Sequence, residues 1–245
     1  MKYQMQDTLN VLCEKLSTKS KVYFCRFGDG DLEVMLGRRQ KNHAYSAELQ
    51  KELIESISII DEDYLRGGIL EEPEFDGFRL TNLHNLHNHY EHFLRNLLPN
   101  YENGKYYSSV LTTYMALVPE HQPIFVEFLN NFIRPKKKLF IGSVDKEIIS
   151  TLIGNVDYYV NVPCPEAYYK IDEWWPKVLE CVDDVDLVIP SAGLAGRVAQ
   201  KRLWNLGKDI HSIELGCIAD AIAGLNTRSW MSRTTENVNK LKVLL

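Results

Sequence analysis

The sequence lacks the features that mark a membrane protein or a nucleic-acid-binding protein. No apolar run approaches the roughly 18 residues that a membrane-spanning helix needs. Asp7, Asn10 and Glu14 interrupt the N-terminal segment where a secretory leader would carry an apolar block. The 28 Lys and Arg residues are outnumbered by 33 Asp and Glu, and the resulting net charge of −5 is unlike the basic character of most nucleic-acid-binding domains. We therefore expect a cytoplasmic protein that has no membrane span and no nucleic-acid partner.

Cysteine is also scarce, and the 5 cysteines form no Cys-x-x-Cys pair. Most of them lie in apolar surroundings, which is typical of buried free thiols in a reducing compartment. A chain of 245 residues buries about 70–75% of its unfolded surface, so it needs neither disulfides nor a structural zinc to fold. The thiols that we expect to be free are Cys13, Cys25, Cys164, Cys181 and Cys217.

The composition is that of an ordinary folded domain. Hydrophobic residues make up 45% of the chain and charged residues 25%, values that exclude a disordered, collagen-like or coiled-coil protein. The sequence contains no internal repeat, no low-complexity stretch and no Ser/Gly-rich linker. We therefore predict a single domain that covers residues 1–245.

Segments with the hydrophobic pattern of strands alternate with segments of helical period. Ser46 is the expected N-cap of one helix, and in the second half of the chain glycine-containing turns separate strands from helices. This repetition predicts an α/β fold with a Rossmann-like, mainly parallel sheet flanked by helices. Right-handed crossovers then bring the loops after the strands to one edge, where such sheets bind ligands. The expected strands are 22–26, 64–70, 138–141, 157–162, 185–189 and 210–215, and the expected helices are 5–16, 32–36, 49–60, 83–97, 145–153, 171–182, 193–206 and 218–223.

The densest chemical signal is the sequence CRFGDGD at the end of the first expected strand. Gly28 and Gly30 allow tight turns and let a ligand approach the backbone closely. Asp29 and Asp31 can both reach one hard divalent cation such as Mg²⁺ or Mn²⁺, and Arg26 offers a guanidinium fork suited to phosphate. A cation held between carboxylates and a diphosphate is typical of a nucleotide-sugar or nucleoside-polyphosphate site. The alternative interpretation is an aspartate that caps a helix within ordinary Gly-Asp-Gly turn chemistry.

This motif resembles the RFGDGE signature of bacterial glycosyltransferases with the GT-D fold, a group first known as domain of unknown function 1792. The resemblance implies that Asp29 matches the family's Asp and that Asp31 replaces its Glu, in a pair associated with the metal and the nucleotide-sugar donor. The replacement keeps the charge and shortens the side chain by one methylene. It also creates an Asp-x-Asp motif, which other metal-dependent glycosyltransferases use. On this resemblance Asp29 and Asp31 are the candidate catalytic and metal-binding residues.

Weaker parts of the resemblance lie in the C-terminal half of the chain. Segments 187–193 and 197–206 resemble the family's strand–glycine–helix unit. Segment 213–216 resembles a characteristic strand end, and the pair Ser229-Trp230 resembles a terminal tryptophan of the family. With these parts the resemblance covers most of the chain, although only the first motif is specific.

A second candidate for phosphate contact is a small-residue turn between a strand and a helix. Ser191, Gly193 and Gly196 offer backbone N–H groups, a hydroxyl and the positive end of a helix dipole. Their spacing matches neither GxGxxG nor a P-loop, so the NAD and ATP fingerprints are absent. A similar turn occurs at 141–143, one unit earlier. The alternative interpretation is that small residues in these turns only allow close packing of an α/β crossover.

Two positions near the C-terminus have polar or aromatic side chains that could contact a ligand. Asp220 follows the last expected strand and could contact a ribose, a metal or an acceptor hydroxyl, or could simply occupy the first turn of a helix. Trp230 with Arg228 could stack on a base or a sugar ring, whereas a core indole is the favoured interpretation.

Two polar groups in the middle of the chain carry weaker signals. His84, His87, His89 and His92 would spread over an arc of roughly 200° on a helix, which is too wide for one metal ion. The acidic loop 71–76 is one place to find the carboxylate base that transfer to a sugar hydroxyl needs, and a solvated loop is the alternative.

Together with these patterns, the resemblance implies a metal-dependent glycosyltransferase of the hexosyltransferase type. The donor would be a nucleoside-diphosphate sugar, with a UDP-sugar favoured. The acceptor would be a hydroxyl of a growing surface polysaccharide or protein-linked glycan, met at the membrane surface if it is lipid-linked. A metal-dependent nucleotide phosphohydrolase and a non-catalytic nucleotide-binding domain are the alternatives. The residues expected to bind the donor are Arg26, Gly28, Gly30, Ser191, Gly193 and Asp220.

Overall fold

A seven-stranded sheet forms the centre of the molecule in the part of the chain that the computed structural model describes. Its order is β3-β2-β1-β7-β6-β4-β5, and every neighbouring pair is parallel. The expected α/β, Rossmann-like fold is therefore confirmed. The residues described are 3–19, 21–39, 45–68, 91–98, 101, 104–228 and 230–245. The strands are β1 Val22–Arg26, β2 Tyr64–Gly68, β3 Tyr107–Ser108, β4 Lys138–Gly142, β5 Tyr158–Asn161, β6 Leu187–Ser191 and β7 His211–Ile213.

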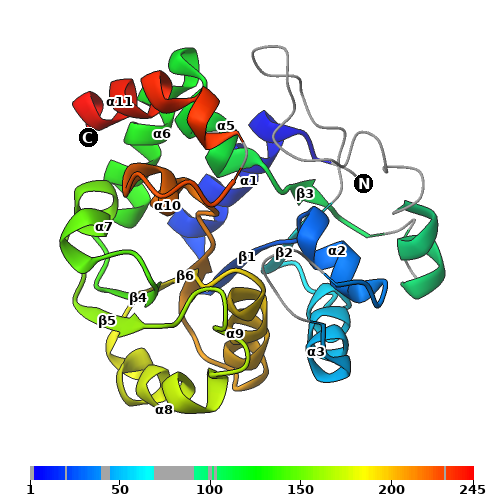
Figure 1. Cartoon of the computed structure of the whole chain (residues 1–245). Coiled ribbons are helices and arrows are strands. Elements are labelled where there is room, and N and C mark those ends of the chain that lie inside the picture. The colour runs from blue at the N-terminus through cyan, green and yellow to red at the C-terminus, as the bar shows by residue number, and fades with distance from the viewer. Residues whose placement is uncertain are drawn as a thin grey trace.

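Helices cover both faces of the sheet (Figure 1). One layer consists of α1 Met5–Thr18, α5 Leu111–Leu117, α6 Gln122–Phe128, α7 Lys146–Ile153, α10 Ile218–Ile222 and α11 Thr235–Leu244. The other layer consists of α2 Asp29–Met35, α3 Ala47–Ile57, α8 Ile171–Cys181 and α9 Leu194–Asn205. The short helical segments are 91–97, η2 Pro119–His121, η3 Leu129–Ile133, η4 Val182–Asp184 and η5 Met231–Arg233. None of the described helices has the length and apolar character needed to cross a membrane.

The side chains of β1 show how the sheet divides the core. Val22 and Phe24 belong to the core beneath the α1 layer, while Tyr23 and Cys25 belong to the core beneath the α9 layer. All four are fully buried. Successive side chains of a strand point to opposite faces, so a strand covered on both sides must be apolar at every position. This explains why 22–26 is a continuous hydrophobic run that ends in Arg26, where the strand reaches the edge of the sheet.

Helix caps follow the sequence signals closely. The Ser46 hydroxyl accepts a hydrogen bond from Leu49 N–H at 3.0 Å and begins α3, as predicted. Asp145 lies one residue before α7, and its Oδ1 accepts from Glu147 N–H at 2.9 Å. These side chains satisfy N–H groups that have no partner within the first turn of a helix.

The β6 region differs from the expected boundaries. The strand expected at 185–189 spans Leu187–Ser191, and Gly142 is the last residue of β4 rather than a break after it. The reason is that β4 and β6 pair in register as far as Gly142 and Ser191. Gly196 accordingly lies inside α9 and not in the turn before it.

Several other expectations can be compared with the structure only in part. Of the helix expected at 83–97, the positions 91–97 are helical and the rest lies outside the described residues. The last two positions of the strand expected at 64–70 also lie outside them.

Helices α5, α6 and α11 and strand β3 were not expected from the sequence. All five thiols are free, as predicted, but only Cys25 and Cys181 are buried, whereas Cys13 and Cys217 are partly buried and Cys164 is exposed.

The connections after β1 and β7 leave the sheet on opposite faces. β1 and β7 are neighbours, yet α2, which follows β1, lies in one layer, whereas α10, which follows β7, lies in the other. In an open α/β sheet this divergence leaves room for a ligand beyond the carboxyl ends of the strands. The first sequence motif lies at this position.

Candidate functional site

The turn between β1 and α2 contains both aspartates of the first motif. Gly28 is the N-cap of α2, and Asp29 and Asp31 lie in its first turn. Gly28 N–H donates to Asp31 Oδ2 at 2.8 Å, and Gly30 N–H donates to Asp29 Oδ1 at 2.9 Å. Both carboxylates therefore accept backbone N–H groups at the start of the helix, where the dipole favours negative charge. The capping interpretation of the motif is correct for these two hydrogen bonds.

Four buried charged side chains meet beneath this turn: Arg26, Asp31, Arg197 and Glu214. We call this group the buried quartet; the exposed fractions of its members are 9%, 3%, 8% and 3%. Arg197 Nε lies 3.1 Å from Asp31 Oδ1, and Arg197 Nη2 lies 3.3 Å from Glu214 Oε2. Arg26 Nη1 lies 3.8 Å from the same Glu214 oxygen. The two guanidinium groups and the two carboxylates balance each other, which is what permits four charges to be buried together.

The arginines of the quartet also bind backbone carbonyl groups. Arg197 Nε donates to the Arg26 carbonyl oxygen at 2.6 Å, and Arg197 Nη1 donates to the Gly193 carbonyl oxygen at 2.8 Å. Arg26 Nε donates to the carbonyl oxygen of Ser109. Arg197 thus connects the end of β1, the turn before its own helix α9, and the carboxylate of Glu214 that follows β7.

Burial and neighbouring charges shift the pKa of two members of the quartet, Asp31 and Arg197. Burial raises the pKa of the Asp31 carboxyl above its usual range, and the charge of Arg197 and the Gly28 N–H oppose that shift. Burial alone would lower the pKa of the Arg197 guanidinium, but the carboxylates of Asp31 and Glu214 raise it above its ordinary value. Arg197 is therefore a permanent positive charge at the base of the turn.

Gly216 makes room for the Arg26 side chain. Its φ of +72° lies in the left-handed region, and a Cβ added there would lie 1.7 Å from Arg26 Nη1. Arg26 Nη1 is buried and makes no hydrogen bond to the residues that the structure describes. Arg26 is therefore enclosed between Gly216 and Glu214, and its contact with a phosphate stays a prediction.

Asp29 and Asp31 differ in what they offer to a divalent cation. Asp29 is partly exposed at the start of α2. Asp31 is buried, and its two oxygens face the Gly28 N–H and the Arg197 guanidinium. A hard cation is often bound by one or two carboxylates together with substrate phosphates. Asp29 fits that role in this arrangement, whereas Asp31 faces a positive charge and does not.

A larger protein-only metal site is not found in the part of the chain that the structure describes. No group of three or more His, Cys, Asp or Glu side chains within the described ranges is placed to hold a metal ion. His92, the one described member of the histidine group, has its ring beside the Asn96 amide at 3.1 Å. His84, His87, His89 and the acidic loop 71–76 lie outside the described residues.

The turn between β6 and α9 lies two strands from the first motif. Ser191 is the last residue of β6, and Gly193, with a φ of +55°, is the N-cap of the 12-residue helix α9. Ser191 pairs in register with Gly142, so the turns after β4 and β6 are neighbours at the same edge. The N-terminus of a helix of this length is suited to a phosphate group. The hydrogen bond from Arg197 to the Gly193 carbonyl connects this turn to the buried quartet.

Asp220 lies on α10, on the far side of β7 from α2. Its Oδ2 accepts a hydrogen bond from the Thr227 hydroxyl at 2.7 Å. Burial raises its pKa, while Thr227 and the charge of Arg228 lower it. Partial enclosure of the Cys164 sulfur raises the pKa of this thiol, and the nearby charge of Asp220 raises it further. Trp230 is buried in the core, as favoured, and not on the surface where a base could stack.

Arg197 and Glu214 were not among the predicted site residues, although they lie in segments 197–206 and 213–216 of the resemblance. They lie far from the first motif in the chain, since Arg197 follows Arg26 by 171 positions. The sequence feature that could have pointed to them is their charge, because both are charged residues in segments that are otherwise mostly buried.

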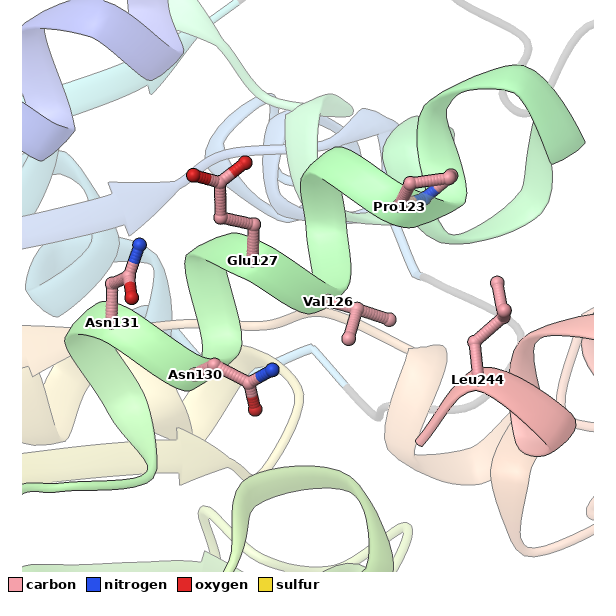
Figure 2. A pocket seen from close by; sticks show the side chains of 6 residues that line it. All are labelled: Pro123, Val126, Glu127, Asn130, Asn131 and Leu244. Atoms are coloured by element: carbon pink, nitrogen blue, oxygen red, sulfur yellow. The ribbon is translucent and has the colours of Figure 1, made fainter.

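A surface hollow of about 400 Å³ lies away from these residues. Its residues come from α6, η3 and the end of α11, and none of them belongs to the site described above (Figure 2). The lining residues are Pro123, Val126, Glu127, Asn130, Asn131 and Leu244.

Comparison with known proteins identifies the fold. No family model matches the chain, and no curated protein matches it in sequence. Among solved structures it is similar to "A New Glycosyltransferase (DUF1792) from Streptococcus sanguinis", with a TM-score of 0.67 and 21% identity over 95% of this chain and 84% of that chain. It is also similar to a structure of domain of unknown function 1792 described as having "a distinct glycosyltransferase fold", with a TM-score of 0.64 and 19% identity over 96% of this chain and 82% of that chain. The chain thus has the glycosyltransferase fold of these domains, as the resemblance implied.

Proposed function

We propose that the protein is a glycosyltransferase that takes a sugar from a nucleoside-diphosphate donor. The observation that carries this proposal is the similarity of fold over 95% of the chain to a structure described as a glycosyltransferase. The polar residues at the carboxyl edge of β1, β6 and β7 support it, because this is where parallel sheets bind nucleotides. A UDP-sugar is the proposed donor, and the proposed acceptor is a hydroxyl of a surface polysaccharide or a protein-linked glycan.

Different residues at this edge would bind different parts of the donor. Asp29, partly exposed at the start of α2, would hold Mg²⁺ or Mn²⁺ together with diphosphate oxygens. Such a cation neutralises the departing diphosphate as a Lewis acid. The hydroxyl of Ser191 and the N-terminus of α9 after Gly193 would bind the diphosphate. Gly28 and Gly30 leave the backbone of the first turn open to the donor.

Asp220 is proposed to face the reacting sugar from the other side of β7. Its carboxylate is oriented by the Thr227 hydroxyl, and burial raises its pKa. Both features suit a group that accepts a hydrogen bond or a proton from a sugar hydroxyl. We therefore place the ribose or the acceptor hydroxyl near Asp220.

The proposal is tested in two steps. First, thermal shift is measured with UDP, GDP, ADP and CDP and with UDP-sugars, each with and without Mn²⁺. A cation-dependent shift with one base supports the donor site, and a flat panel contradicts it. Second, the donor so identified is incubated with and without glycan acceptors, and the release of nucleoside diphosphate is followed. Release that depends on an acceptor supports transfer, whereas equal release without any acceptor identifies a hydrolase and contradicts the proposal.

Asp29→Asn is the variant that should lose the cation dependence. Glu33→Gln is its matched control, because Glu33 also lies on α2 and pairs with Arg38 on the surface. We expect the control to keep the shift of the wild-type protein. Loss of the shift in both variants would show that the effect is not specific to Asp29.

A further inference from the structure

Asp31 is held from two sides by groups of the protein itself. Its Oδ2 accepts the Gly28 N–H at 2.8 Å, and its Oδ1 lies 3.1 Å from Arg197 Nε. Only 3% of the residue is exposed. Turning the carboxylate outward to a cation would leave the N–H of the helix cap without its acceptor and would remove one of the two carboxylates that balance the buried Arg197 guanidinium, which is costly in a low-dielectric interior.

Arg197 contacts four groups that come from separate parts of the fold. Besides Asp31 these are the Arg26 carbonyl at 2.6 Å, the Gly193 carbonyl at 2.8 Å and Glu214 Oε2 at 3.3 Å. The planar guanidinium fixes the directions of its donors, so it holds these partners in one relative arrangement. Arg197 therefore fixes the position of the β1–α2 turn relative to the β6–α9 turn. These turns carry the two candidate phosphate-binding segments.

We infer that Asp31 is a positioning residue, which acts through Arg197, and that Asp29 is the carboxylate of the motif that faces a bound cation. The inference rests on the proposed function for the nature of the ligand. It assigns different roles to two aspartates that the sequence motif presents as an equivalent pair. It also assigns a function to Arg197, which fixes the distance between the two turns on which a diphosphate would lie.

Because the charges of the buried quartet balance, the loss of Asp31 alone or of Arg197 alone should be destabilising. Removal of Asp31 leaves two guanidinium groups facing Glu214, and removal of Arg197 leaves two buried carboxylates with only the Arg26 guanidinium of the quartet to balance them. Asp31 Oδ1 and Glu214 Oε2 make no hydrogen bond to the described residues, so ion pairing holds them in place. Loss of both Asp31 and Arg197 restores the balance, and the double variant should therefore be less damaging than the two single effects combined.

The test compares Asp29→Asn, Asp31→Asn, Arg197→Met and the double variant Asp31→Asn/Arg197→Met. Thermal unfolding gives the coupling between the two positions. Mn²⁺ binding in the presence of UDP is followed by the electron paramagnetic resonance signal of free Mn²⁺. Leu12→Ala is the control for loss of stability alone. Leu12 is fully buried in α1 and belongs to the core on the face of the sheet opposite to α2 and α9.

We expect Asp29→Asn to keep the melting temperature and to abolish Mn²⁺ binding. Asp31→Asn and Arg197→Met should each lower the melting temperature by roughly 10 °C. Both should weaken Mn²⁺ binding by a similar factor of about ten, because they disturb the same support of the site. In the double variant both losses should be smaller than the sum of the single losses. Leu12→Ala should lower the melting temperature and leave Mn²⁺ binding unchanged.

Two results would overturn the inference. One is that Asp31→Asn abolishes Mn²⁺ binding while Arg197→Met leaves it intact, which identifies Asp31 as a direct ligand. The other is that the melting temperatures of the two single variants add in the double variant. If Arg197→Met does not fold, Arg197→Lys replaces it, because lysine keeps the charge but loses the fork. If the wild-type protein binds neither Mn²⁺ nor UDP, the proposed function fails, and the unfolding cycle alone then decides whether Asp31 and Arg197 act as one unit.

Discussion

Replacing Gly216 by alanine tests how tightly the buried quartet is packed. Gly216 has a φ of +72°, and a Cβ at this position would lie 1.7 Å from Arg26 Nη1 and 2.8 Å from Arg26 Cζ. Neither distance is sterically possible, so the guanidinium must move. Its movement separates Arg26 from Glu214 and from the Ser109 carbonyl, since both contacts lie in the same enclosed space.

Two costs contribute to the expected loss of stability. Alanine in the left-handed region costs about 1–2 kcal/mol relative to glycine. Breaking one partner away from a buried ion pair costs about 3–5 kcal/mol. We therefore expect Gly216→Ala to lower the free energy of unfolding by about 4–7 kcal/mol, which corresponds to a fall of roughly 8–28 °C in melting temperature for a chain of this size.

Gly207→Ala is the matched control. Gly207 has a φ of +68°, close to that of Gly216, but a Cβ there would meet nothing within 4 Å. It therefore carries the backbone cost of about 1–2 kcal/mol without the collision. Urea unfolding followed by far-ultraviolet circular dichroism measures both variants. Equal losses in the two would refute the argument, because the difference of about 3–5 kcal/mol is assigned to the displacement of Arg26.

Two further predictions concern stability away from the site. His211 is buried in β7, and burial lowers its pKa to about 4. Between pH 6.5 and pH 4 the unfolded chain therefore binds more protons than the folded one, so stability falls with falling pH, by about 2 kcal/mol from pH 7.5 to pH 5. The His211→Gln variant should lose most of this pH dependence when its free energy of unfolding is measured in urea at each pH. An unchanged pH dependence would show that other groups cause it. Ser46→Ala removes the cap that accepts Leu49 N–H at 3.0 Å and should cost about 1 kcal/mol. Ser58→Ala, an exposed serine at the other end of α3, should cost less, and equal losses would contradict the capping role.

The strands could be predicted where their hydrophobic runs are short and clearly bounded. β1 has the predicted bounds because its side chains face two cores and every position is buried. β6 extends two residues beyond the expected end and includes Pro190, although proline is normally excluded from the interior of a sheet. Pro190 is tolerated because β6 pairs with β7 only at Leu187 and Val188, so the sheet has already ended on that side.

The candidate site could be predicted only as a local motif. The turn from Arg26 to Asp31 was predicted from glycines and carboxylates that are neighbours in the sequence. The partners of that turn, Arg197 and Glu214, approach it through the crossover connections of the sheet, and no local pattern shows which charged side chain will meet which. The motif by itself presents Asp29 and Asp31 as an equivalent pair, because it does not show these partners.

The most direct test of the account is a crystal structure of the protein soaked with Mn²⁺ and UDP. The account predicts an anomalous Mn²⁺ peak at the carboxylate of Asp29, a diphosphate between the β1–α2 turn and the turn at Ser191 and Gly193, and Asp31 still paired with Arg197. A diphosphate bound elsewhere, or an edge of β1, β6 and β7 that stays empty at saturating ligand, would contradict it.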